Sequence, residues 1–131
     1  KIVWFSRGSS KREDIFEKMK TNLITNDRIV FFPEGTRQSY TTLSSAEDVR
    51  EKLKIGLLKS IFESKEYPVQ VCISTNKEKI FNEKTFKGEY GVNVKTHFSR
   101  QIIPSEYDNL NSFVDEICSA WFESWSIVHM I

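Results

Sequence analysis

The sequence has almost no net charge, little Gly and Pro, and no long apolar run. Its 19 Lys and Arg stand against 18 Asp and Glu, so the formal net charge is only +1. A charge this small creates no global field to steer polyanions or a membrane surface. It argues against nucleic-acid binding through overall charge, and any basic site must be local. The longest apolar run, residues 29–32, is far below the ~20 residues that a membrane-spanning helix needs. With five Gly and three Pro, no Pro- or Gly-rich linker divides the chain.

Cysteine is also scarce, with Cys72 and Cys118 the two present. They lack the close spacing and the His neighbours of a zinc site, and a domain of this size needs no disulfide staple. We therefore expect two buried free thiols and no metal site.

The composition that remains is that of a folded domain. Hydrophobic residues make up 39% of the chain and aromatic residues 13%, which excludes a disordered chain. The 131 residues correspond to one domain, residues 1–131. Because the chain opens on an apolar, strand-like run at residues 2–5, we expect no signal peptide, and we expect that the N-terminal part of the domain lies upstream.

Apolar spacing predicts alternating strands and helices. Two Ser residues, each followed three positions later by an acid, have the spacing of capping boxes and predict helix starts. The polar residues 76–89 predict a loop or hairpin arm. This order is typical of an α/β domain with a mostly parallel or mixed sheet flanked by helices, whose sites lie at the carboxyl ends of strands. The expected strands are residues 1–6, 28–32, 69–74 and 92–98, and the expected helices begin at Ser10, Ser45 and Pro104, the second ending at Pro68.

One segment, FPEGTR, combines the groups of an anion-binding loop at the end of an expected strand. Pro33 takes the chain out of the sheet because it cannot donate to a ladder, and Gly35 permits a close approach that a side chain would block. Arg37 offers a planar fork for two phosphate oxygens, and Thr36 adds a donor. Glu34 would repel a phosphate unless it pairs with an Arg or accepts a substrate hydroxyl, so we expect it to orient rather than react. The alternative is a plain turn with a surface arginine.

FPEGTR closely resembles the third signature block of the glycerolipid acyltransferases, the family of 1-acylglycerol-3-phosphate acyltransferases and their relatives. WFSR at residues 4–7 resembles the family's second block, a strand ending in Arg. Lys54 and Gly56 resemble the Lys-x-Gly of the helix after the third block, and YPVQV around Pro68 resembles the fourth block. The resemblance covers nearly the whole chain and implies a glycerol-3-phosphate acyltransferase-like fold.

The resemblance implies transfer of a fatty acyl group from acyl-coenzyme A, or from an acyl carrier protein, to a hydroxyl of a lysophospholipid. The foremost acceptor is 1-acylglycerol-3-phosphate, in phospholipid synthesis. Acyl-coenzyme A would be a co-substrate, with no bound cofactor and no nucleic-acid partner. Arg7 and Arg37 would hold the acceptor phosphate, with Glu34, Gly35 and Thr36 shaping the pocket.

Four further residues would support that pocket by resemblance: Pro33, Lys54, Gly56 and Pro68. Gly56 falls inside the second expected helix, where Gly costs about 1 kcal/mol relative to Ala. We therefore expect Gly56 to let the helix backbone approach the loop at residues 33–37.

The family's catalytic block, His followed after four residues by Asp, is absent from this chain. The residue five after His97 is Ile102, and His129 stands two residues from the end. Both histidines are expected to be structural or exposed. We expect the catalytic His and Asp upstream of Lys1, so that this segment alone is inactive. The alternative is an inactive relative that acts as a phospholipid-binding module.

The last expected helix is apolar on more than one face near its end, at Trp121, Trp125, Ile127, Met130 and Ile131. Core packing explains most of this pattern, and docking at a membrane interface is the alternative. Together with the resemblance, it leads us to expect a membrane-associated protein that faces the cytoplasm, at the endoplasmic reticulum in a eukaryote. Its membrane contact would come from upstream or C-terminal segments.

Overall fold

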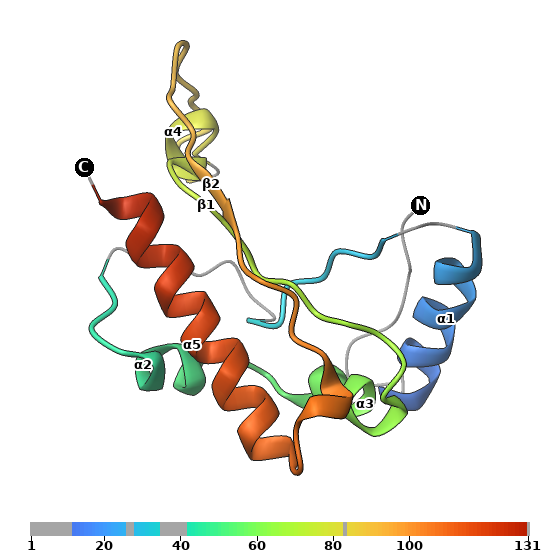
Figure 1. The fold of residues 1–131 in the computed structure, drawn as a ribbon. Helices are drawn as coiled ribbons and strands as arrows, with labels where there is room; N and C mark the ends of the chain where they lie inside the picture. The colour runs from blue at the N-terminus through green and yellow to red at the C-terminus, as the bar shows by residue number, and fades with distance from the viewer. Residues whose placement is uncertain (1–11, 26–27, 35–41, 83, 131) are drawn as a thin grey trace.

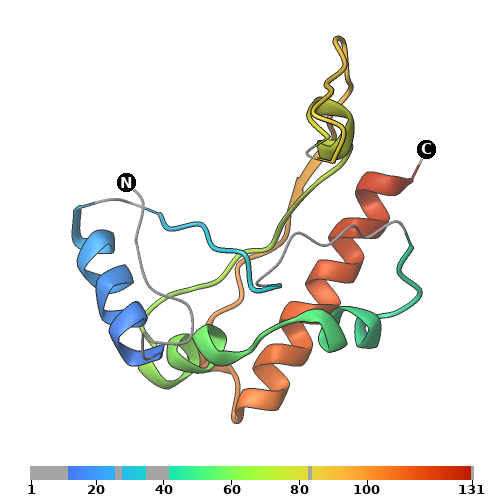
Figure 2. The same ribbon diagram turned by 180° about the vertical axis from the view of Figure 1, so that it is seen from behind.

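The computed structural model describes residues 12–25, 28–34, 42–82 and 84–130. These residues form one α/β domain of helices and a small two-stranded sheet, in which α5 packs against both strands (Figures 1 and 2). The expected α/β class is therefore confirmed. The elements are α1 (Arg12–Thr25), α2 (Ala46–Lys52), α3 (Gly56–Ser64), β1 (Cys72–Ser74), α4 (Lys77–Ile80), β2 (Thr96–Phe98), a 3₁₀ turn η1 (Pro104–Glu106) and α5 (Leu110–His129).

The sheet, within the described ranges, is a single antiparallel pair, whereas we expected a mostly parallel or mixed sheet. Ile73 of β1 lies opposite His97 of β2, and an isolated antiparallel bridge joins Val69 to Ile102. The segment between β1 and β2 folds back on itself with an antiparallel bridge between Asn82 and Lys87, and a hairpin of this kind joins antiparallel strands.

The expected strands are present only in part. Those at residues 69–74 and 92–98 are shortened to β1 and β2. Residues 28–32 are not assigned to a strand, and the described sheet contains only β1 and β2. The expected strand at residues 1–6 lies outside the described residues.

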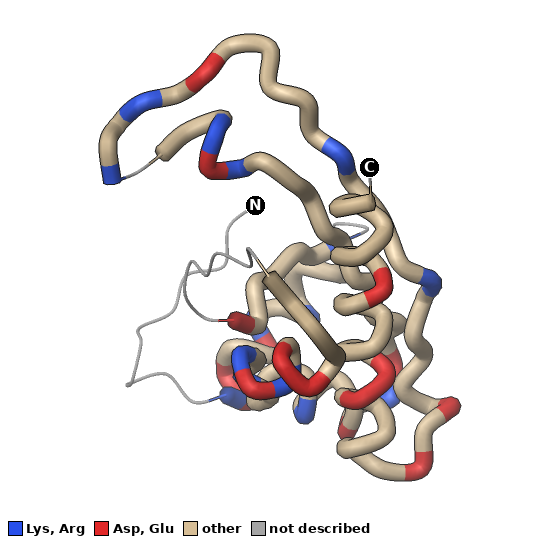
Figure 3. The backbone as a smooth tube through the Cα atoms, turned by 90° about the vertical axis from the view of Figure 1, so that its left-hand side faces the viewer, with Lys and Arg blue, Asp and Glu red and all other residues tan. Residues whose placement is uncertain are grey.

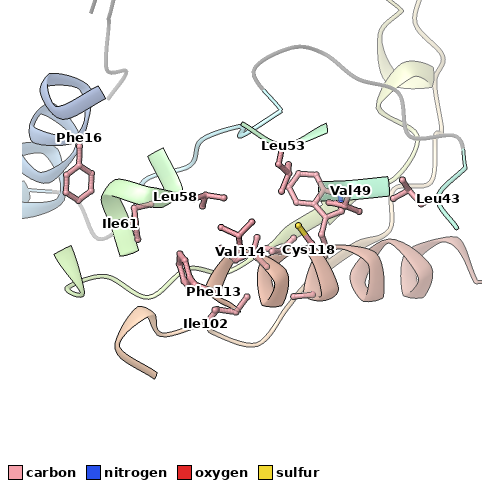
Figure 4. Close-up of a cluster of buried hydrophobic side chains, with 14 residues drawn as sticks. Phe16, Leu43, Val49, Leu53, Leu58, Ile61, Ile102, Phe113, Val114 and Cys118 are labelled. Atoms are coloured by element: carbon pink, nitrogen blue, oxygen red, sulfur yellow. The ribbon is translucent and has the colours of Figure 1, made fainter. Parts of the chain in front are cut away.

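The core forms around α5. Phe113 and Val114 are fully buried and Ile117 is nearly so, and α5 packs against α2 as well as against the sheet (Figures 1 and 4). Burying an apolar side chain of this size contributes about 1.5–3 kcal/mol, so α5 is the main source of apolar burial. The stripe expected for this helix is confirmed, since its members are buried or half-buried: Leu110, Phe113, Val114, Ile117, Trp121, Trp125 and Val128.

The second expected helix is in fact two helices. We predicted one helix from Ser45 to Pro68, but α2 ends at Lys52 and α3 begins at Gly56. Leu53, between them, has an extended backbone and a buried side chain. Leu53 is buried, as the apolar spacing of a continuous helix predicts, although its backbone is extended. Periodicity alone therefore could not reveal the break.

Residues 75–95 form a projection that we call the arm (Figures 1 and 2). At its base, the amide of Thr75 donates to the carbonyl of Lys95 over 3.0 Å. Further out, it carries α4 and an antiparallel bridge between Asn82 and Lys87. The loop or hairpin arm expected from residues 76–89 is thus confirmed as a hairpin arm.

Candidate phosphate-binding site

The described part of the candidate site is the segment that leads into FPEGTR. Residues 28–32 are followed by a turn at Pro33 and Glu34. Phe31 is half-buried against the core, whereas the next side chain, Phe32, is 77% exposed. Phe31 therefore anchors the approach to the turn and leaves the turn itself at the surface.

Four of the expected phosphate-site residues lie outside the described residues: Arg7, Gly35, Thr36 and Arg37. The described members of the site are Glu34 and the supporting residues Pro33, Lys54, Gly56 and Pro68.

The turn at Pro33 is tied to the segment between α2 and α3. The backbone amide of Lys54 donates to the carbonyl of Pro33 over 2.8 Å. An intramolecular hydrogen bond of this kind contributes about 0.5–1.5 kcal/mol net. The break after α2 frees the Lys54 amide for this bond, because in a continuous helix it would donate to a carbonyl four residues back. Two segments singled out by the resemblance are thereby in direct contact.

The carboxylate of Glu34 is the most unusual group of the site. Its Oε2 atom is buried and has no hydrogen-bond partner among the described residues. A buried polar atom that lacks a partner costs about 1–3 kcal/mol. Such a carboxylate accepts hydrogen bonds only, so it suits a hydroxyl or a guanidinium as partner.

Gly56 does not have the surroundings that we expected. It is the first residue of α3 rather than an interior residue. A Cβ added there would lie 3.6 Å from Cδ of Arg12, an ordinary contact with the side chain of a residue in α1. The described start of the loop is approached through the Lys54 amide. The expected approach of Gly56 to the rest of the loop stays a prediction, because residues 35–37 lie outside the described residues.

The other supporting residue, Pro68, lies exposed between α3 and the bridge at Val69. It does not end a helix, because α3 already ends at Ser64 and Lys65 takes a left-handed backbone with φ of 58°.

Both histidines have hydrogen-bond partners within α5. Nδ1 of His97 lies 3.0 Å from the hydroxyl of Ser124, which is buried in α5. The exposed His129 stacks on Trp125 with ring centroids 4.3 Å apart, and its Nδ1 lies 2.8 Å from the Trp125 carbonyl. Both arrangements fit the expected structural or exposed roles.

The thiols differ from each other. Cys118 is buried in α5, and burial raises the pKa of its thiol to about 11, so it is a poor nucleophile. Cys72 is exposed on β1, which corrects the expectation that both thiols are buried. Its side chain alternates with that of the half-buried Ile73, a feature of a strand with one solvated face that cysteine statistics do not capture. Across the described ranges no group of three or more potential metal ligands is found.

The arm carries a feature that the sequence interpretation missed, a set of exposed apolar side chains among lysines. Two open hollows of the described surface also lie along the arm; one is lined by residues that include Lys79, Lys87 and Glu89. The signal available in the sequence was the alternation of Lys with Phe, Ile and Tyr at residues 77–90, which we had interpreted only as polarity.

Comparisons with protein-family models, with curated proteins and with solved structures each found no match. In the part of the chain that the structure describes, no helix has the length and hydropathy to cross a membrane.

Proposed function

We propose that this chain is the phosphate-binding portion of an acyltransferase domain. The domain would move a fatty acyl group from acyl-coenzyme A, or from an acyl carrier protein, to a hydroxyl of a lysophospholipid, with 1-acylglycerol-3-phosphate as the foremost acceptor. The sequence support is the resemblance of FPEGTR and its neighbouring blocks to the glycerolipid acyltransferases. The structural support is the bond between the Lys54 amide and the Pro33 carbonyl, which joins two of those blocks.

The observation that carries the proposal is the buried, unpartnered Oε2 of Glu34. Arg7 and Arg37 bind the acceptor phosphate, with Thr36 adding a donor and Gly35 allowing the backbone close to it. Glu34 accepts a hydrogen bond from the acceptor's glycerol hydroxyl or from one of these guanidinium groups. Either partner offsets the cost of burying the carboxylate, and so either makes the site more stable when occupied.

The fold that goes with this proposal is glycerol-3-phosphate acyltransferase-like. The resemblance implies that Arg7 and Arg37, each at the end of an expected strand, would meet at one edge of the sheet. The protein works at a membrane facing the cytoplasm, at the endoplasmic reticulum in a eukaryote.

The chemistry is direct attack of the acceptor hydroxyl on the thioester carbonyl. The oxygen–carbon bond forms, the carbon–sulfur bond breaks, and the proton of the hydroxyl passes to a general base as coenzyme A leaves. That base is the His of the His-x4-Asp block, located upstream of Lys1. No acyl-enzyme forms, and the raised pKa of Cys118 agrees with a route that needs no thiolate.

The test is release of coenzyme A from acyl-coenzyme A in the presence of 1-acylglycerol-3-phosphate. The chain of residues 1–131 should show no turnover, whereas a longer product of the same gene that contains the upstream block should be active. Turnover by the 131-residue chain that survives His97→Ala and His129→Ala would contradict this proposal.

A second candidate function is a non-catalytic phospholipid-binding module that keeps the same phosphate site. It is favoured by one observation, the absence of His-x4-Asp from residues 1–131. The two candidates separate on the upstream sequence: a His followed after four residues by Asp supports the enzyme, and its absence supports the module.

A further inference from the structure

The arm is an ordered projection whose backbone is held by internal hydrogen bonds. The Asn76 side chain donates to the Asn93 carbonyl over 2.7 Å, and the Glu89 amide donates to the Lys79 carbonyl over 3.0 Å. Gly88 is required where the two sides meet, because a Cβ there would lie 2.5 Å from the carbonyl oxygen of Ile80. The arm therefore presents its side chains in a fixed arrangement.

Large apolar side chains lie exposed along this arm. Phe86 is 81% exposed, and both Ile80 and Phe81 are at least half exposed. The rings of Phe81 and Phe86 meet edge to face at 6.2 Å, so they form one apolar cluster. Tyr90 is fully exposed. A clustered set of exposed apolar groups is typical of a surface that contacts a partner or a membrane.

The backbone conformation of Phe86 also indicates a contact surface. Phe86 has φ of 54°, in the left-handed region that suits Gly or Asn and is costly for a bulky residue. Its side chain is too exposed to recover that cost by packing in the core. A strained aromatic residue at an exposed turn suggests a role outside the folded chain.

The charge of the arm indicates what kind of surface it contacts. Between residues 75 and 95 the chain has five Lys against three Glu, a formal excess of two positive charges in a protein whose total is +1. Figure 3 shows these basic positions recurring along the projection. Aromatic side chains flanked by lysines suit an anionic lipid surface, where the rings enter the interface and the ammonium groups pair with headgroups.

The end of α5 adds apolar surface beside the arm. Met130 is 70% exposed and Ile127 is 42% exposed. Nζ of Lys95, at the base of the arm, donates to the Met130 carbonyl over 3.3 Å. The arm and this helix end also lie toward the same end of the molecule (Figure 1).

We propose that the arm, residues 75–95, docks the chain on an anionic lipid surface, with Phe81 and Phe86 entering the interface and the surrounding lysines contacting the headgroups. This docking goes beyond the proposed acyl transfer and does not depend on it. It is measured on vesicles that contain no acyl donor and no lysophospholipid, so its failure and the failure of the proposed function are distinguishable.

The experiment is sedimentation of the chain with vesicles of phosphatidylcholine alone and of phosphatidylcholine mixed with phosphatidylglycerol. The wild-type chain should sediment with the mixed vesicles, and less so at high salt. Phe86→Asn should weaken binding about tenfold or more, since a buried Phe contributes that much. Its melting temperature should stay the same or rise, because Asn tolerates the left-handed backbone. The double variant Lys84→Gln/Lys87→Gln should lose about fivefold per lysine on the anionic vesicles.

The controls match these changes away from the arm. Val30 has the same exposed fraction as Phe86, 81%, so Val30→Asn removes an equally exposed apolar group. Lys18→Gln/Lys59→Gln makes the same change of charge on α1 and α3. Both controls should bind vesicles as the wild type does.

Three results would overturn the proposal. The first is absence of wild-type binding to the mixed vesicles. The second is wild-type affinity in either arm variant. In Phe86→Asn it would exclude insertion of the ring, and in Lys84→Gln/Lys87→Gln it would exclude pairing of the lysines with headgroups. The third is a dimer in sedimentation velocity that Phe86→Asn dissolves, which would assign the arm to a second copy of the chain.

Discussion

At the scale of single residues, Glu34 connects the fold to the proposed function. A carboxylate oxygen that is buried without a described partner weakens the empty protein, and it is useful only if a ligand supplies the missing donor. A residue of this kind lowers the stability of the empty protein but favours ligand binding. Replacing it should therefore raise the free energy of unfolding and weaken binding.

We therefore predict that Glu34→Gln raises the free energy of unfolding slightly, by less than about 1 kcal/mol, because Glu34 is half-buried and only its Oε2 is buried without a described partner. The same change should weaken binding of 1-acylglycerol-3-phosphate roughly tenfold, since a neutral amide is the poorer acceptor. Thermal melting and titration on the same samples measure both. Glu51→Gln on the exposed face of α2 is the matched control. Unchanged affinity in Glu34→Gln would remove this residue from the site.

The phosphate site stays a prediction, whereas the placement of its supporting residues can be compared with the structure. FPEGTR could be recognised because Pro, Gly and Arg in that order have few purposes other than a turn with a charged end. The contact partner of the turn could not be recognised from the sequence. It is the backbone amide of Lys54, and every residue except proline has such an amide. Gly56 attracted the prediction instead, because a glycine inside an apolar stripe is visible in the sequence.

At the scale of secondary-structure elements, the break between α2 and α3 changes what Gly56 does. As the first residue of α3, it has no positive φ, and among the described residues an added Cβ would meet the flexible side chain of Arg12. Gly56→Ala should therefore stabilise the protein by up to about 1 kcal/mol.

Binding of the acceptor should be unchanged in Gly56→Ala. The contrasting variant is Gly91→Ala, where φ of 68° should make Ala destabilising by about 1 kcal/mol. Urea unfolding of both variants checks the pair. A loss of stability together with weaker acceptor binding in Gly56→Ala would restore the original expectation that this glycine packs against the loop.

The start of α2 gives a pH dependence. Asp48 accepts hydrogen bonds from the hydroxyl and the amide of Ser44 and from the amide of Ser45. The bond from the Ser44 hydroxyl contributes most to lowering the pKa of Asp48 below its ordinary value of 3.8. The stabilisation is therefore present above that value and is lost as the pH falls through the lower folded-state pKa.

Asp48→Asn should accordingly flatten the acid side of a plot of melting temperature against pH and lower the melting temperature at neutral pH. Asp108→Asn, in the exposed turn before α5, makes the same change of charge as a control. If the acid side keeps its slope in Asp48→Asn, this cap does not contribute to acid sensitivity.

The elements themselves could be predicted where periodicity is strong. The apolar stripe of α5 and the apolar spacing of α1, which includes the buried Phe16 and Met19, indicated both helices, because an apolar face must be buried. The break at Leu53 and the short, antiparallel sheet could not be located, because strand direction depends on how the chain returns and not on the composition of each strand. The arm was anticipated as a hairpin, but its polarity masked the exposed Phe81 and Phe86.

At the scale of the whole molecule, two surfaces have different proposed functions. The turn at Pro33 and Glu34, tied to Lys54, forms part of the site proposed for the acceptor phosphate. The arm is proposed to hold the chain at a lipid surface. Because the first task concerns a single lipid molecule and the second an assembled membrane, a monomeric lipid probe and a vesicle separate them.

The most direct test of the central claim is calorimetric titration of the wild-type chain with a short-chain 1-acylglycerol-3-phosphate that stays monomeric, against the matching monoacylglycerol, which lacks the phosphate. We predict binding of the phosphate-bearing lipid and at least tenfold weaker binding of the monoacylglycerol. Arg37→Ala should abolish that preference, since a charge-assisted bond contributes about 1.5–3 kcal/mol. Arg37→Lys should restore it only in part, because Lys lacks the bidentate fork. Equal affinity for the two lipids, or an unchanged preference in Arg37→Ala, would contradict the account.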